Sequence, residues 1–594
     1  MPLDRSGRVP GRVSLFVERL RARRRPRIGA TFVLAGGPGQ SASDSFQGDA
    51  LGELAPTFRN RDLIVFDQRG TGKSGLLRCR GLEKANLLRA GVQATDCAAK
   101  LGLARAFYTT SDSVDDIEAI RRRLGIPKIA LYGTSYGTKV ALAYALRYPG
   151  NVERLLLDSV VEAGGPDPLY LDTFAAMPRV LRALCRTGCR HITRDPVADV
   201  AQLTQRLAAG RAPGQLVDAR GRRRLTKFGR EDLFIVLVGG DFDPALRAAF
   251  PGAVRSGLAG DFAPLVRLKR RALQIDAKPP PPRSLSPALY AAATCEETAF
   301  AWDRRASPLQ RLRQTQAQAG TVPDSAFAPF DRATALDNDL LSLCLHWPQS
   351  PEAPALGTGP LPDVPVLLLE GEEDLRTPVE NARRTAAGFP HARLLVAPDT
   401  GHSVLGSDLS GCTARAFARF FLGGRLPVRC ARRRALFPPL PIAPTSLRRV
   451  EPEGRLRGLR GRTVTALALT LSDVADDTLS STIVDEGASD LAHGGGLRGG
   501  SYRVNGDNTA ILRRMEYVPG VRISGRLRSF GERRQRGRLR IAGRGVPGGV
   551  LLVRGNRVRG RLGGRRVRDV LRPRTSLNDT LFAAAASLPG PPGR

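Results

Sequence analysis

The sequence predicts an α/β fold with a mostly parallel central sheet, an inserted helical lid and a separate C-terminal all-β module. Three observations lead to this fold class. Short apolar runs that end in glycine-rich turns alternate with helical segments up to about residue 158. The alternation then stops for about two hundred residues and returns at Val364. Beyond about Leu447, short strand-like segments are separated by glycine-rich turns.

The first part of the chain justifies the parallel sheet. Buried strands are predicted at 29–35, 61–67, 128–132 and 152–157. Between the second and third of these, residues 113–124 place Val114, Ile117, Ile120 and Leu124 at helical spacing. Strands that alternate with helices indicate parallel pairing.

The remaining elements define the predicted boundaries. Strands at 364–370 and 392–397 and a helix at 412–422 return the chain to the first sheet. The C-terminal strands are predicted at 463–471, 499–504, 511–517, 521–527, 538–541, 549–553 and 558–562. The domains are therefore a core at 1–163 and 358–430, a lid at 164–357, a Pro-rich linker at 431–446, a basic β-rich module at 447–575 and a flexible tail at 576–594.

Composition excludes several classes of protein. The 594 residues are 42% hydrophobic and 25% charged, which is typical of globular chains. The 92 Lys and Arg give a formal net charge of +36, but nearly all are arginine, in a chain rich in Gly, Ala and Pro. This bias is typical of a GC-rich genome, and no base-reading motif accompanies it, so we expect no nucleic-acid partner. No apolar run reaches the roughly 20 residues of a transmembrane segment.

A candidate nucleophile lies in Gly133-Thr134-Ser135-Tyr136-Gly137, a G-x-S-x-G pentapeptide between a predicted strand and a predicted helix. Glycines at these positions allow the sharp turn that exposes the Ser135 hydroxyl at the end of the sheet. A serine hydroxyl needs an imidazole to accept its proton and a carboxylate to orient that imidazole. The sequence therefore has to supply a matching histidine and acid.

His402 and Asp374 fit these roles best. The chain has five histidines, and His402 is the one in a turn directly after the last strand of the sheet. Asp374 follows the preceding strand and is favoured over Glu372 and Glu373, because Thr377-Pro378 starts the next helix and leaves it on the strand-end loop. The order Ser135, Asp374, His402 is the order of the α/β-hydrolase fold. Backbone N–H groups of Tyr136 and Gly37 are the predicted oxyanion donors.

Eight cysteines form four pairs that are close in sequence: Cys79/Cys97, Cys185/Cys189, Cys295/Cys344 and Cys412/Cys430. Their spacing does not match a metal site, and we predict disulfides, which imply an oxidising compartment. The alternative is buried free thiols in a cytosolic protein. The N-terminus has no readable signal peptide, so with disulfides Met1 is expected to be an internal start in a longer secreted precursor.

Together, these motifs resemble the secreted tripeptidyl-aminopeptidase and prolyl-aminopeptidase group of α/β-hydrolases. The resemblance rests on the segments 36–39, 67–74, 133–138, 374–378 and 401–402 and on the lid segments Cys295-Glu296-Glu297 and Cys344-Leu345-His346-Trp347-Pro348. It implies that acidic lid residues, Glu297 first and Glu296 second, hold the substrate's free α-amino group. Ala35 and Leu375 depart from the prolyl-aminopeptidase pattern, and the module after Leu447 lies outside the family.

These observations predict a secreted or envelope-located serine hydrolase, without metal or cofactor, that removes short pieces from the free N-termini of peptide substrates through an acyl-enzyme. The rival activity is hydrolysis of small esters by the same three residues. A rival from another class is an inactive protein that binds an anionic cell-envelope polymer through the basic C-terminal module. The alternative for that charge is a solvated arginine-rich surface.

Overall fold

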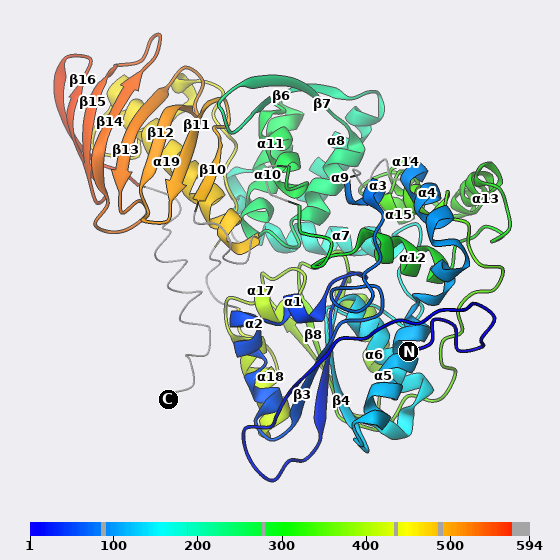
Figure 1. Ribbon diagram of the computed structural model, residues 1–594. Coiled ribbons are helices and arrows are strands. Elements are labelled where there is room, and N and C mark those ends of the chain that lie inside the picture. The colour runs from blue at the N-terminus through cyan, green and yellow to red at the C-terminus, as the bar shows by residue number, and fades with distance from the viewer. Residues whose placement is uncertain (85–90, 187, 276–278, 433–436, 485–490, 573–594) are drawn as a thin grey trace. The chain divides into compact units, whose positions relative to one another are not determined.

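The computed structural model describes residues 1–84, 91–186, 188–275, 279–432, 437–484 and 491–572 (Figure 1). These residues divide into two compact units. The first unit contains residues 1–180 and 279–432, and the second contains residues 181–275 and 437–572. The predicted tail at 576–594 and part of the predicted linker, 433–436, lie outside the described residues.

Within the described residues, the first unit is built on a seven-stranded sheet with the order β1-β3-β2-β4-β5-β8-β9. The strands are β1 (Val17–Leu20), β2 (Ala30–Leu34), β3 (Asp62–Phe66), β4 (Ile129–Thr134), β5 (Val152–Asp158), β8 (Val366–Gly371) and β9 (Ala392–Ala397). β1 pairs antiparallel with β3, whereas the other neighbours pair parallel. The mostly parallel sheet is confirmed, and the edge strand β1 was not predicted.

Helices cover both faces of this sheet (Figure 1). Phe32 and Leu34 of β2 share a core with α5 (Thr110–Arg123) and α6 (Tyr136–Arg147). Val33, the residue between them, belongs to the core that contains α18 (Cys412–Leu422). Successive strand residues therefore point to opposite faces, and both faces exclude water, which explains why these strands are continuous apolar runs.

The predicted lid, 164–357, is mainly helical but is divided between the two units. The first unit takes α12 (Pro287–Glu297), α13 (Pro308–Thr321), α14 (Arg332–Leu336) and α15 (Asp339–Cys344). The second unit takes α8 (Pro196–Ala208), the hairpin β6 (Ala212–Val217) and β7 (Arg223–Phe228), α9 (Arg230–Gly239), α10 (Pro244–Leu258) and α11 (Ala263–Ala272). The division differs from the predicted boundaries, which treat the insertion as one piece.

The C-terminal part of the second unit is an eight-stranded antiparallel sheet in chain order, as far as the chain is described. Its strands are β10 (Leu491–Gly495), β11 (Gly499–Asn505), β12 (Ala510–Glu516), β13 (Arg522–Arg528), β14 (Arg536–Ala542), β15 (Gly549–Arg554), β16 (Arg557–Leu562) and β17 (Arg565–Val570). The separate β-sheet is confirmed, and β10 and β17 were not predicted.

One predicted strand of this part is wrong. Residues 463–471 lie inside the long helix α19 (Gly458–Val484), whose Leu467, Leu471 and Val474 are buried in one core with Leu539 and Leu551 of the sheet. The spacing of three and four residues is helical, but Leu, Val and Thr are common in strands, so a short window was ambiguous. The helix covers one face of the sheet.

The four predicted disulfides are confirmed. Cα–Cα separations are 5.5 Å for Cys79–Cys97, 5.0 Å for Cys185–Cys189, 5.1 Å for Cys295–Cys344 and 5.7 Å for Cys412–Cys430. The Cys295–Cys344 bridge joins the C-terminal ends of α12 and α15 in the first unit. None of the described helices is both long enough and apolar enough to span a bilayer.

Candidate active site

Ser135 lies between the end of β4 and the start of α6, with φ 55° and ψ −123°. A non-glycine residue rarely adopts this conformation, and here the neighbouring glycines stabilise it by close packing. A Cβ on Gly133 would lie 2.4 Å from the Gly137 carbonyl oxygen, and a Cβ on Gly137 would lie 2.2 Å from that of Leu34. The pentapeptide therefore requires glycine on both sides of the serine.

His402 and Asp374 form a buried pair. His402 Nδ1 is 2.8 Å from Asp374 Oδ2, and the side chains are 4% and 0% exposed. Asp374 follows β8 and His402 follows β9, neighbouring strands whose ends come together. A Cβ on Gly371 would lie 2.0 Å from the Gly401 carbonyl oxygen, so only glycine permits this approach of the two loops.

Thr377 holds both members of this pair. Its hydroxyl donates to Asp374 Oδ2 at 2.8 Å and lies 3.2 Å from His402 Nδ1, and its N–H donates to Asp374 Oδ1 at 2.9 Å. Burial acts to raise the pKa of Asp374, but the His402 charge and these hydrogen bonds hold it below its usual value. Asp374 is therefore an ionised carboxylate that accepts the Nδ1 proton and leaves the Nε2 lone pair for proton transfer.

Asp158, at the end of β5, connects the serine and histidine loops. Its carbonyl oxygen accepts the Ser135 N–H at 2.8 Å. Its carboxylate accepts the N–H groups of Val404 and Leu405, the second and third residues after His402, at 2.7 and 2.9 Å. Burial raises the pKa of Asp158, and the two amide hydrogen bonds oppose that rise. The sequence analysis missed this residue, because only the folded sheet brings β5 between the two loops.

The two predicted oxyanion donors lie beside the serine. A Cβ on Gly36 would come within 3.2 Å of Ser135 Cβ, so the glycine turn after β2 packs against the elbow. The N–H groups of Gly37 and Tyr136 donate no hydrogen bond to any residue that the structure describes. For Tyr136 this follows from its place in the first turn of α6. Both amides are thus available to a developing negative charge.

Asp67 supports this turn from the next strand. Its carboxylate accepts hydrogen bonds from Ser41 Oγ at 2.9 Å, from Ser43 N at 2.8 Å and from Lys73 N at 2.9 Å. Arg69 is also buried, with two hydrogen bonds to Asp116 at 2.8 and 2.7 Å. The Asp67-to-Ser74 motif therefore fixes the loops around the site through its own contacts.

Glu297 lies near the serine but is already paired. Its carboxylate accepts Lys139 Nζ, Thr110 N and Thr110 Oγ1, each at 2.6 Å, and lies 3.4 Å from the Tyr136 hydroxyl. Both members of the Glu297–Lys139 pair are about 5% exposed or less. A substrate ammonium would have to replace Lys139, so this geometry does not favour the expected amine-binding role.

Glu296 is buried at 0% exposure and faces other partners. Its carboxylate accepts Trp347 Nε1 at 3.0 Å, Arg304 Nη2 at 3.0 Å and Ser350 N at 2.9 Å. This geometry does not favour the expected amine-binding role of Glu296, whose contacts hold the helix α12 against the segment that follows Cys344. The described residues contain no group of three His, Cys, Asp or Glu arranged to hold a metal ion.

Glu370 is a further buried acid at this end of the sheet, and the sequence analysis also missed it. It lies in β8, and its Oε2 accepts Val160 N at 3.0 Å, whereas the buried Oε1 has no hydrogen-bond partner among the described residues. Burial, followed by the negative charge of Asp374, raises the pKa of Glu370 well above its usual value. A neutral carboxylic acid therefore lies behind the Asp374–His402 pair.

The chain matches two known protein families over parts of its length. Residues 32–183 match the family described as alpha/beta hydrolase fold, and residues 328–432 match TAP-like protein. The first match contains Ser135, and the second contains Asp374 and His402.

Named relatives agree with these matches. A tripeptidyl aminopeptidase of Streptomyces lividans is 25% identical over 481 residues, 72% of this chain and 81% of the relative. The serine protease Hip1 of Mycobacterium tuberculosis is 30% identical over 164 residues, 24% of this chain and 31% of the relative. A proline iminopeptidase of Neisseria meningitidis is 30% identical over 150 residues, 25% of this chain and 37% of the relative. The chain thus has the α/β-hydrolase fold, contains a segment that matches TAP-like protein, and is similar to tripeptidyl aminopeptidases over most of its length.

Proposed function

We propose that this protein is a serine hydrolase in which Ser135 is the nucleophile, His402 the general base and Asp374 the residue that orients His402. The observation that carries the proposal is the buried 2.8 Å contact between His402 Nδ1 and Asp374, at the same end of the parallel sheet as a serine in a strained elbow. Asp158 hydrogen-bonds both the serine loop and the histidine loop, which supports their joint action.

The proposed reaction proceeds through an acyl-enzyme. Ser135 Oγ attacks the carbonyl carbon while His402 Nε2 takes the hydroxyl proton, and the N–H groups of Tyr136 and Gly37 bind the oxyanion. The bond to the leaving amine breaks as His402 returns the proton to that amine. Water then attacks the Ser135 ester while His402 takes a proton from it. The bond from the acyl carbon to Ser135 Oγ breaks, His402 returns the proton to that oxygen, and the acid is released. These steps use residues of the chain alone.

We infer that the substrates are peptides, from whose free N-termini short pieces are released. The names of the relatives, tripeptidyl aminopeptidase and proline iminopeptidase, support this class. Hydrolysis of small esters is the second candidate, and one observation favours it: Glu297 and Glu296 are both bound to partners inside the protein and leave neither acid for a substrate ammonium. The four disulfides support an extracellular or envelope location.

A panel of chromogenic amides tests the proposal. Aminoacyl, dipeptidyl and tripeptidyl amides with free amines are compared with their N-acylated forms and with the corresponding esters. We expect kcat/KM to be highest for one of the free-amine amides. Activity on esters alone would establish the second candidate.

Two variants tie that activity to the site. Ser135→Ala should lower kcat by about 10⁴-fold or more while the protein stays folded. Ser325→Ala, an exposed serine in the same unit, is the matched control and should be unchanged. Equal activity in the two variants would refute the role of Ser135.

A further inference from the structure

The open face of the C-terminal sheet carries an unusual set of arginines. On β13 to β17, every second side chain points away from the core that contains α19. Three positions on each of these five strands form the central part of this open face. Eleven of these described positions are arginine, which we call the arginine face: Arg526, Arg528, Arg536, Arg538, Arg540, Arg554, Arg557, Arg559, Arg561, Arg566 and Arg568. All eleven are exposed.

The strand register places these arginines opposite one another. One row across the sheet reads Arg526, Arg538, Leu552, Arg559 and Arg568. Directly facing arginine pairs are Arg526–Arg538, Arg528–Arg536, Arg536–Arg554, Arg554–Arg557, Arg559–Arg568 and Arg561–Arg566. The other positions of the face are Ser524, Val550, Leu552 and Val570, so the set contains no acid.

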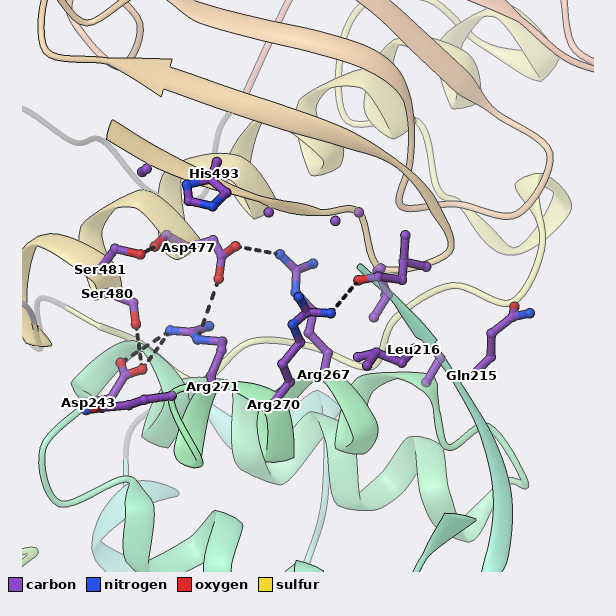
Figure 2. A pocket seen from close by; sticks show the side chains of 18 residues that line it. Gln215, Leu216, Asp243, Arg267, Arg270, Arg271, Asp477, Ser480, Ser481 and His493 are labelled. Carbon is purple, nitrogen blue, oxygen red and sulfur yellow. Dashed lines mark hydrogen bonds and ion pairs between the residues drawn. The ribbon is translucent and has the colours of Figure 1, made fainter. Parts of the chain in front are cut away.

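Other arginines of the same unit are paired with acids. Figure 2 shows Arg267 and Arg271 directed at aspartates, with ion-pair distances of 3.3 Å from Arg267 to Asp477 and 2.9 Å from Arg271 to Asp243. The exposed Arg222 pairs with Asp218 at 2.9 Å. Across the described part of the chain, no member of the arginine face forms an ion pair. The positive charge of this face is therefore not balanced by ion pairs with acids of the described chain.

The arrangement costs stability in the isolated protein. Like charges that face each other across neighbouring strands are destabilising, because their side chains start about 5 Å apart. Long side chains relieve part of this repulsion by spreading into solvent, and salt screens the rest. A surface that keeps such pairs together is suited to an anion that neutralises both members.

The chemistry of the face selects phosphate. A guanidinium presents a planar fork of N–H donors that can bind two oxygens of a phosphate or of a carboxylate. One arginine therefore uses both oxygens of a carboxylate, whereas a phosphate has further oxygens for a second arginine. Two arginines on facing strands can hold different oxygens of one phosphate. The face extends over about 20 Å by 13 Å at ordinary strand spacing, so it can bind several phosphates of one chain at once.

The composition of the face also argues against nucleic acid. Single-stranded nucleic acids are bound by basic surfaces that include aromatic side chains on which bases stack. No aromatic residue occurs among the positions of this face. We propose that the arginine face binds a linear, base-free polymer of repeating phosphate groups. This inference is independent of the hydrolytic site.

The test measures binding of linear inorganic polyphosphate to the full chain, by fluorescence anisotropy at several salt concentrations. The variant Arg538→Gln/Arg559→Gln/Arg568→Gln removes three arginines of one row. The control Arg190→Gln/Arg448→Gln/Arg449→Gln removes the same charge from exposed arginines of the same unit, in 3-10 turns that are not part of the open face.

We expect the row variant to weaken polyphosphate binding by on the order of 100-fold, and the control by less than about threefold. The slope of log Kd against the logarithm of the salt concentration should be smaller by about 2 in the row variant than in wild type. The melting temperature of the row variant should be unchanged or higher at low salt, because facing charges are removed. If this variant does not fold, Arg536→Gln/Arg554→Gln/Arg557→Gln tests the adjacent row in the same way.

Three outcomes would overturn the proposal. Equal weakening by the row variant and the control would show attraction by net charge alone. Tighter binding of single- or double-stranded DNA of matched charge than of polyphosphate would assign the face to nucleic acid. Binding of vesicles that contain anionic phospholipid, with none of free polyphosphate, would assign it to a membrane surface.

Discussion

Asp158→Asn should uncouple the histidine loop from the serine loop without removing any residue that reacts. The carboxylate accepts three hydrogen bonds at 3.1 Å or less, from Val404 N, Leu405 N and Ser159 Oγ. Asparagine has one acceptor oxygen, so one buried backbone N–H faces an NH2 group and loses its partner. Such a loss costs about 1–3 kcal/mol of folding free energy.

The fall in kcat/KM of Asp158→Asn should be larger than the lower stability of the variant can explain. Val404 and Leu405 are the second and third residues after His402, so a shift of their backbone moves the His402 imidazole relative to Ser135. A displacement of about 1 Å is enough to lower kcat about 100-fold. The assay is kcat/KM for the best chromogenic substrate, measured well below the melting temperature of the variant, with circular dichroism to show that the variant is folded.

Asp167→Asn is the matched control for this variant. Asp167 also accepts two backbone N–H groups, from Leu169 at 3.0 Å and Leu171 at 2.6 Å, in a loop of the first unit. This substitution should lower stability with little effect on kcat/KM. If Asp158→Asn keeps kcat/KM within about threefold of wild type, the proposed coupling of the two loops is wrong.

Three further predictions concern buried groups of the first unit. Because Glu370 has a raised pKa, the folded state binds its proton more tightly than the unfolded state, and its contribution to stability falls as pH rises above about 4.5. The melting temperature of wild type should therefore fall relative to that of Glu370→Gln as the pH rises from about 5, and parallel curves would contradict the raised pKa. Replacing Cys295 and Cys344 with serine should lower the free energy of unfolding by about 4 kcal/mol, because the disulfide closes a loop of 49 residues. The replacement should also raise KM at urea concentrations too low to unfold the sheet. Urea titration measures the first effect, and kinetics measure the second. Glu297→Gln leaves Lys139 without its buried partner and should destabilise the protein by about 3 kcal/mol. Its kcat/KM should fall equally for free-amine and N-acylated substrates. A fall for free-amine substrates alone would support the amine-binding role of Glu297.

Much of the fold and of the candidate site could be predicted from local sequence patterns. The glycines around Ser135 and the turns after each buried strand are requirements of the backbone, so they are visible in a single sequence. The cysteine pairs were found by proximity along the chain. The positions of Asp374 and His402 followed from the rule that functional residues occur at the carboxyl ends of parallel strands.

Long-range contacts account for what was missed. Asp158 and Glu370 act through partners more than 200 positions away in sequence, Val404 for the first and Val160 for the second. The strand expected at 463–471 became helix because burial against the sheet decides between two patterns that a window of nine residues leaves open. Lys139 lies 158 positions before Glu297, so the sequence does not show that this lysine pairs with the acid that was expected to bind the substrate.

Covalent labelling of the nucleophile tests the central claim most directly. The protein is treated with a fluorophosphonate, which forms a stable ester with an activated serine, and the digest is analysed by mass spectrometry. The account predicts one adduct, on Ser135, that is lost in Ser135→Ala and forms far more slowly in His402→Ala. An adduct on another serine, or equal labelling of wild type and His402→Ala, would contradict it.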